Sequence, residues 1–115
     1  MRFMMMVRAT EDSEAGVLPS RELVVAMGEF NGEMVKAGVL LAGDGLQPSS
    51  KGARVKFSGG KRTVVDGPFT ETKEQLAGFY LIDARDLNEA IQLAAKIPPA
   101  RVGSIEVRPV RELSA

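Results

Sequence analysis

Apolar residues in this chain occur in short continuous runs, a pattern that is typical of buried strands. Residues 3–7 are apolar at every position, and residues 78–82 are apolar after an initial glycine. A third run, residues 39–42, ends at the turn sequence Gly43-Asp44-Gly45. The pattern predicts strands over 3–7, 39–42 and 78–82, and the first and last of these are expected to be apolar on both faces.

A long segment after residue 20 carries apolar side chains at helical spacing. The spacings are four, three and four, which makes one stripe along a helix: Leu23, Met27, Phe30 and Met34. Ser20 is the expected N-cap of this helix, which should run to about Ala37 and end at Gly38. Gly28 and Gly32 lie inside it four residues apart, which predicts close approach to a neighbouring element. The polar residues 10–19 before it are predicted to form a loop.

A second helix and a last strand are predicted in the C-terminal part. Asp86 and Glu89 form a capping pair, and the helix that they begin should stop before Pro98-Pro99. Its apolar residues on one side are Leu87, Ile91 and Ala94. The last strand has two faces: Ile105, Val107 and Val110 on one, and Glu106 and Arg108 on the other.

Residues 53–65 have the pattern of a hairpin. Two short strands, 53–57 and 61–65, are joined by Ser58-Gly59-Gly60, and the pair of glycines suits a tight turn. Alternation along the first strand predicts one buried face and one basic face. Five cations occur here without an acid: Lys51, Arg54, Lys56, Lys61 and Arg62. They either attract an anion or solubilise an exposed hairpin, and we expect the second.

The predicted order is β-α-β, an inserted β-hairpin, a turn, and β-α-β again. This order matches an α+β fold, a ferredoxin-like split βαβ sandwich with two helices on one face of an antiparallel sheet. The strands that are apolar on both sides would leave an exposed apolar surface on the second face. We therefore expect a homodimer in which two copies pack sheet to sheet.

Length and charge narrow the class of protein. A chain of 115 residues is predicted to form a single domain, residues 1–115. Fifteen basic and fifteen acidic residues balance, so no overall field attracts polyanions, and we expect no nucleic-acid partner. The apolar run 3–7 is too short for a signal-peptide core or a membrane span, so the sequence predicts a cytoplasmic protein without a membrane partner.

The chain contains neither cysteine nor histidine. The absence of cysteine excludes disulfides, thiolate nucleophiles and cysteine-ligated metal sites. The absence of histidine removes the Ser-His-Asp and Cys-His arrangements and the commonest transition-metal ligand. Acid–base chemistry would have to use carboxylates, lysine or Tyr80, and we predict no resident cofactor or metal.

The densest candidate chemistry lies in residues 64–74, which read VVDGPFTETKE. Asp66-Gly67-Pro68 is a strong turn signal at the end of a strand, and Phe69 can anchor that turn. Thr70 is the expected N-cap of a short helical turn. That turn holds two carboxylates and an ammonium: Glu71, Glu74 and Lys73. The segment is either a ligand site or a simple turn followed by a solvated helical turn.

Three stretches resemble the DGPF subgroup of the YCII-related proteins. They are residues 37–43 with Gly45-Leu46 and Pro48-Ser49-Ser50, then Asp66-Gly67-Pro68-Phe69 with Glu71, Lys73 and Glu74, and finally Ile105-Glu106-Val107-Arg108. The resemblance spans nearly the whole chain. It implies ferredoxin-like subunits that form a dimeric α+β barrel.

The resemblance leaves two functions open. YCII-like relatives suggest a small-molecule enzyme with a His-Asp pair, of which this chain keeps only Asp66. As an enzyme, the protein would bind its substrate between the sheet and the DGPF turn, with Asp66 as the catalytic general base. The ligand-binding residues would be Gly67, Pro68, Phe69, Glu71 and Glu74, with Lys73 or Arg108 holding an anionic group. A metal-assisted variant would need Asp66 beside Asp44 or Glu71.

The other function is a non-catalytic ligand-binding or regulatory module that uses the same pocket. DGPF proteins look like companions of extracytoplasmic-function sigma factors, which implies a regulatory or accessory role.

Overall fold

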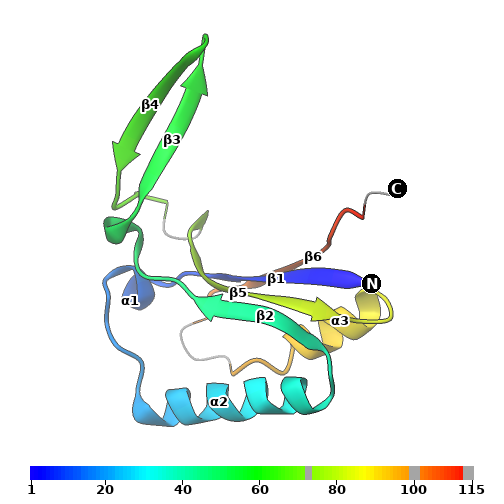
Figure 1. Cartoon of the computed structure of the whole chain (residues 1–115). Coiled ribbons are helices and arrows are strands. Elements are labelled where there is room, and N and C mark those ends of the chain that lie inside the picture. The colour runs from blue at the N-terminus through cyan, green and yellow to red at the C-terminus, as the bar shows by residue number, and fades with distance from the viewer. Residues whose placement is uncertain (72–73, 99–101, 113–115) are drawn as a thin grey trace.

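The computed structural model describes residues 1–71, 74–98 and 102–112 and contains two antiparallel sheets and three α-helices in that part of the chain (Figure 1). The strands are β1 (Arg2–Arg8), β2 (Leu40–Gly45), β3 (Ala53–Ser58), β4 (Lys61–Asp66), β5 (Leu76–Asp83) and β6 (Ile105–Pro109). The helices are α1 (Glu11–Glu14), α2 (Arg21–Lys36) and α3 (Leu87–Ala94), with a 3₁₀ turn, η1, at Ser49–Lys51.

The main sheet has four strands in the order β2-β5-β1-β6. Each neighbouring pair is antiparallel, so β1 and β2 run parallel with β5 inserted between them. This is the strand order of a split βαβ unit. The helices α2 and α3 lie on the same side of the sheet, and no α-helix of the described residues covers the other face (Figure 1). The α+β prediction with two helices on one face is confirmed.

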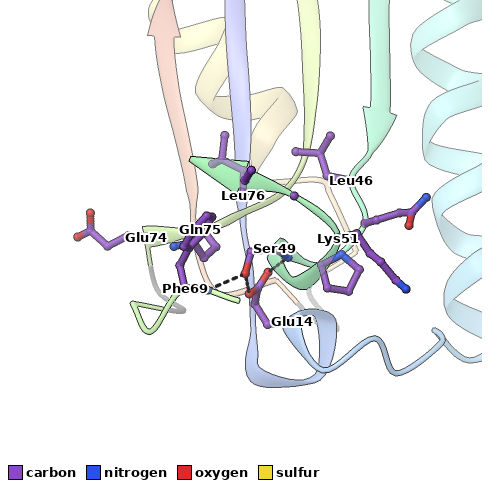
Figure 2. Close-up of a pocket in the computed structure, with 12 residues that line it drawn as sticks. Glu14, Leu46, Ser49, Lys51, Phe69, Glu74, Gln75 and Leu76 are labelled. Carbon is purple, nitrogen blue, oxygen red and sulfur yellow. Dashed lines mark hydrogen bonds between the residues drawn. The ribbon is translucent and has the colours of Figure 1, made fainter. Parts of the chain in front are cut away.

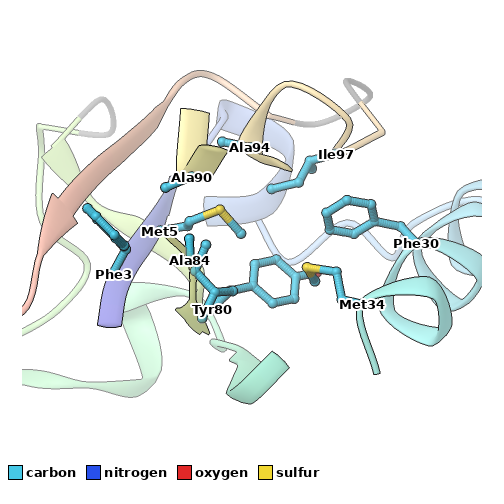
Figure 3. Packing of buried hydrophobic residues seen from close by; sticks show 10 residues of the cluster. Phe3, Met5, Phe30, Met34, Tyr80, Ala84, Ala90, Ala94 and Ile97 are labelled. Atoms are coloured by element: carbon cyan, nitrogen blue, oxygen red, sulfur yellow. The ribbon is translucent and has the colours of Figure 1, made fainter. Parts of the chain in front are cut away.

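The core lies between the sheet and these two helices (Figure 3). Alternation along β1 and β5 sends every second side chain to this side. The buried strand residues are Phe3, Met5, Tyr80 and Ile82, and the buried helical residues are Phe30, Met34, Ala90 and Ala94. Phe3, Met5 and Ile82 are at most 1% exposed, and burying a side chain of this size contributes about 1.5–3 kcal/mol.

The ends of α2 follow the sequence prediction. The Ser20 hydroxyl oxygen accepts a hydrogen bond of 3.1 Å from the Leu23 N–H. Gly38 follows the C-cap with a φ of +72°, a conformation that side chains rarely adopt. The prediction for Gly28 and Gly32 is wrong, because a Cβ added at either would meet no atom within 4 Å. The four-residue spacing of these two glycines therefore does not mark a close contact with another element of this chain.

Two predicted boundaries are also wrong. The loop predicted at 10–19 contains α1, whose N-cap Thr10 accepts from the Ser13 N–H. The turn predicted at 43–45 is part of β2, where a Cβ on Gly43 would lie 2.8 Å from the Tyr80 ring. This glycine therefore serves close packing between strands rather than a turn.

The packed side of α3 differs from the prediction in part. Ala94 faces the core as predicted, but Leu87 and Ile91 are 47% and 49% exposed, and Ala90 is buried instead. Small alanine side chains let the helix lie close to the sheet, and packing overrides the simple count of large apolar residues.

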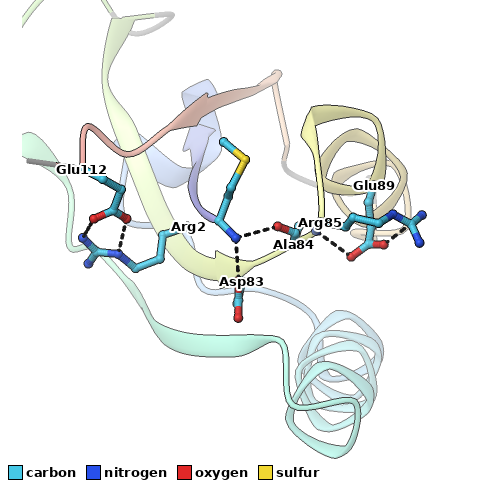
Figure 4. A network of polar contacts seen from close by, with 7 residues as sticks. Arg2, Asp83, Ala84, Arg85, Glu89 and Glu112 are labelled. Atoms are coloured by element: carbon cyan, nitrogen blue, oxygen red, sulfur yellow. Dashed lines mark hydrogen bonds and ion pairs between the residues drawn. The ribbon is translucent and has the colours of Figure 1, made fainter. Parts of the chain in front are cut away.

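Polar contacts fasten one end of the main sheet (Figure 4). The Met1 ammonium lies 3.0 Å from an Asp83 carboxylate oxygen and donates to the Ala84 carbonyl. Arg2 makes a bidentate pair with Glu112, and its hydrogen bond lowers the pKa of that carboxyl. These groups are exposed, so they position the strand end more than they stabilise it.

No helix in the described ranges combines the length and the apolar character needed to cross a bilayer.

We predict that Tyr80 titrates above the ordinary tyrosine pKa of about 10, because burial raises its pKa. The folded pKa then exceeds the unfolded one. The stability from neutral Tyr80 is therefore complete below about pH 10 and is lost as the pH rises through the folded pKa. Since the chain has one tyrosine and no tryptophan, tyrosinate absorbance reports this group alone. Tyr80→Phe should lose less stability than the natural chain over that pH range, and a tyrosinate midpoint at or below the ordinary value would contradict the prediction.

Candidate functional site

The DGPF turn is packed directly against η1. A Cβ added to Gly67 would overlap the carbonyl group of Ser49. The Gly67 N–H donates a hydrogen bond of 3.0 Å to the Gly52 carbonyl. Only glycine fits at this position, because the contact is with backbone atoms that a side chain cannot push aside.

A chain of hydrogen bonds joins α1, η1 and the turn (Figure 2). The Glu14 carboxylate accepts from the Ser49 N–H at 3.0 Å and also from the Ser49 hydroxyl. The same hydroxyl oxygen accepts from the Phe69 N–H at 3.1 Å. Glu14 therefore orients Ser49, and Ser49 holds the backbone of the DGPF turn. Sequence reasoning missed this pair, because Glu14 lay in a predicted loop and stands 35 residues away from Ser49.

Phe69 ties the base of the hairpin to the same turn. The Arg54 guanidinium lies over the Phe69 ring, 4.0 Å from its centroid, which is a favourable cation–π distance. The Phe69 side chain is half-buried. This contact gives Phe69 the anchoring position that the sequence predicted for it.

A cavity of about 570 Å³ opens beside these residues, within the size range of sites for small organic molecules. Its walls come from α1, the segment around η1, the DGPF turn and the start of β5 (Figure 2). Apolar walls are provided by Leu46, Phe69 and Leu76. Polar groups at its edge are Glu14, Ser49, Lys51, Glu74 and Gln75.

The predicted site residues are only partly brought together. Phe69 and Glu74 line the cavity. Asp66 is exposed at the end of β4, and it is not among the cavity's lining residues. Its register partner Ala53 does line the cavity, so Asp66 stands next to it.

Glu71 lies beside a neighbouring hollow. Glu71 and Thr70 line that hollow together with Glu11 of α1, and Glu74 lines both spaces. The Glu74 N–H donates to the Glu71 carbonyl at 2.9 Å. Lys73 lies outside the described residues.

Arg108 belongs to a different part of the surface. It pairs with Met4 on the sheet face without helices, and its side chain is 71% exposed. Arg8 is the cation beside Glu74: it donates to the Glu74 carbonyl at 3.2 Å and pairs with Glu106 at 2.7 Å. Met4 and Arg8 are four residues apart, roughly 13 Å along a strand. The signal that could have found Arg8 is its position just after an apolar strand.

The charged groups of the candidate site are all in contact with solvent in the single chain. Over the ranges 1–71, 74–98 and 102–112, no polar or charged residue is buried. The same ranges contain no group of three or more His, Cys, Asp or Glu placed to hold a metal ion. Asp44, proposed beside Asp66 for a metal, instead pairs with Phe79 on the main sheet.

Comparison with known proteins decides the family. The model of the YCII-related domain matches residues 1–114 of this chain. The chain belongs to the YCII-related domain family. An uncharacterized protein of Rhizobium meliloti (strain 1021) is 47% identical over 78 residues. That alignment covers 66% of this chain and 63% of the relative, so the chain spans less than two thirds of that protein.

A solved structure supports the fold of this YCII-related chain. It is a 5-chloro-2-hydroxyhydroquinone dehydrochlorinase from Burkholderia phenoliruptrix AC1100, in complex with 2,5-dihydroxybenzoquinone. The TM-score is 0.54, and the match covers 96% of this chain and 94% of that chain. Because the sequences are 12% identical, the likeness shows a shared fold and not a shared activity.

We predict that Ser49→Ala destabilises the protein by about 1–3 kcal/mol, because it removes the partner of the Glu14 carboxylate and of the Phe69 N–H. Ser50→Ala, at the exposed neighbouring residue, should change stability by less than about 0.5 kcal/mol. Urea unfolding of both variants measures the difference. Equal costs for the two serines would contradict the structural role assigned to Ser49.

Proposed function

We propose that this chain is a small-molecule enzyme whose site is the cavity beside the DGPF turn. The observation that carries the proposal is the cavity itself. It has a suitable volume, apolar walls and a few polar groups at its edge, and a rigid set of hydrogen bonds supports it. The resemblance of residues 66–69 to the DGPF subgroup places the same segment at the centre of the proposal.

The walls of the cavity favour a flat organic molecule with an anionic edge. Phe69 and Leu76 would contact the ring or apolar body, and the Lys51 ammonium would meet the anionic oxygen. Glu14 already accepts two hydrogen bonds from Ser49, so it serves as a support and not as the proton acceptor. The 2,5-dihydroxybenzoquinone bound in the structural neighbour is a molecule of this kind, and we take it as a probe.

In this proposal Asp66 is the general base, and it acts on a molecule that enters past Ala53. Phe69, which follows Gly67 and Pro68, forms part of the wall, and Glu74 lies at the edge. Glu71 lines the neighbouring hollow. Arg108 lies on the face without helices, so it would bind a ligand only at a contact between two copies of the chain.

The second part of the proposal is a cytoplasmic homodimer, built as a dimeric α+β barrel through the face of the main sheet that carries no helix. Two pairs of apolar side chains from the central strands β1 and β5 lie on this face: Met4 beside Leu81 and Met6 beside Phe79. All four are only half-buried in the single chain. Covering them would remove an apolar surface from water.

A non-catalytic ligand-binding or regulatory module is the alternative. It is favoured because no polar or charged residue in the described ranges is fully buried, whereas an acid–base group normally needs partial desolvation. In this role the same cavity would sense a ligand. A connection with an extracytoplasmic-function sigma factor belongs to this alternative.

Asp66→Asn separates the two functions. The carboxylate is exposed, so the variant should keep its melting temperature, but it should bind 2,5-dihydroxybenzoquinone more weakly or lose turnover of it. Glu29→Gln, an equally conservative change on exposed α2, is the matched control. Calorimetry measures binding, and the quinone absorption spectrum followed over time measures turnover.

Each result has a defined meaning for the proposed site. Binding without turnover supports the sensing alternative. If Asp66→Asn keeps both stability and binding, Asp66 has no role in the site. If neither the quinone nor a panel of aromatic acids binds the natural chain, the cavity is not a ligand site.

The homodimer predicts a mass near twice the 12.3 kDa of one chain in light scattering at micromolar concentration. Leu81→Arg places a charge on the face without helices and should give a folded monomer. Ile91→Arg, on the exposed side of α3, should remain dimeric. A natural chain that is monomeric at this concentration would remove the proposal.

A further inference from the structure

The hairpin β3–β4, called the arm below, extends from the body on the side of the main sheet opposite α2 and α3 (Figure 1). Residues 53–64 and Asp66 are exposed, and Val65 is half-buried. The sequence predicted one buried face for this hairpin, and that prediction is wrong for the single chain. Its two glycines, at φ of +57° and +77°, form the tight turn as expected.

One face of the arm is apolar. In an antiparallel pair, residues directly opposite each other point to the same side. Val55 pairs with Val64, and Phe57 lies two residues beyond Val55 on the same face. These side chains are 49%, 64% and 71% exposed, respectively. The arm thus presents a row of apolar side chains, flanked on the same face by Arg62, the register partner of Phe57, whose guanidinium lies 5.6 Å from the centre of the Phe57 ring.

The base of the arm is held firmly while its length is uncovered. Arg54 stacks on Phe69, and the Gly67 N–H bonds to the Gly52 carbonyl. A two-stranded hairpin by itself is marginally stable in water, so the arm needs a surface to cover it. The radius of gyration fits an arm that projects from the body, because it is 15.9 Å, whereas roughly 13 Å is expected for a compact chain of this length.

Charge indicates which surface would cover the arm. The arm, residues 53–66, contains four of the fifteen basic residues and one of the fifteen acidic ones, Asp66. The rest of the chain therefore carries eleven basic and fourteen acidic residues. The body of this same chain is the complement of its own arm, and electrostatic complementarity favours their association.

We propose that the arm of each protomer lies on the body of a second copy, with Val55, Phe57 and Val64 packed against it. The proposal rests on the homodimer described above. A copy seated on the face without helices would lie beside the arm, because both are on the same side of the sheet (Figure 1). The arms would then add a reciprocal contact to the contact between the sheets.

Phe57→Asp tests the arm directly. It should weaken dimerisation by roughly tenfold or more in Kd, the size expected when one buried aromatic contact is replaced by a charge. Val35→Asp, which puts the same charge at a residue 62% exposed on α2, should leave Kd unchanged. Analytical ultracentrifugation measures both, and circular dichroism checks that both variants fold.

Crosslinking gives a second measurement. Because the chain has no cysteine, Ser58→Cys at the tip of the arm can carry a single photocrosslinker. Irradiation should give a covalent dimer whose crosslink maps to the body of the second copy, whereas a label at Val35→Cys should not.

The outcomes distinguish this proposal from the one on which it rests. A monomeric natural chain overturns both. A dimer that Leu81→Arg dissociates but Phe57→Asp leaves intact overturns the arm contact alone. Salt-sensitive binding of DNA that needs Lys56 and Lys61, with no crosslink between copies, would also overturn it and assign the arm to nucleic acid.

Discussion

The contact between Gly67 and the Ser49 carbonyl is the constraint on which the rest of the site depends. At this contact the backbone of the DGPF turn lies directly against the backbone of η1. The Ser49 hydroxyl can then reach the Phe69 N–H while it donates to Glu14. Each of these bonds contributes modestly, but together they hold α1, η1 and the turn in one arrangement.

The cavity and the arm are both consequences of that arrangement. Phe69 forms a wall of the cavity and also carries Arg54 of the arm on its ring. Lys51 and Ala53 line the cavity, and Ala53 is the first residue of the arm. A change in the position of the arm therefore moves the cavity wall. The proposed ligand and the proposed contact with a second copy would act on the same few residues, so thermodynamic linkage between them is expected.

The sequence predicted what depends on local pattern and missed what depends on distant packing. Strands β1, β5 and β6, helix α2 and the Gly59-Gly60 turn follow from periodicity and turn residues. Leu87 and Ile91 were wrongly assigned to the packed side of α3, because small residues at 90 and 94 let the helix approach the sheet. Gly43 was assigned to a turn, since nothing local reveals the Tyr80 ring beside it.

The candidate site shows the same division. The turn and Phe69 were found because Asp-Gly-Pro is a local signal, and the exclusion of histidine and cysteine chemistry needed only a count. Glu14 and Ser49 were missed because only the fold brings them together. The role of Asp66 as a base stays a prediction.

The absence of histidine and the exposure of Asp66 both limit proton transfer in the single chain. A carboxylate in full contact with water is a weak base at neutral pH, and burial is the usual way to make it stronger. The described residues of one chain bury no polar or charged group. Proton transfer by Asp66 would therefore require cover from the bound ligand or from a second copy. Asp66 lies at the base of the arm, where a partner protomer docked on the arm would exclude water, so the dimer and not the single chain would be the catalytic unit.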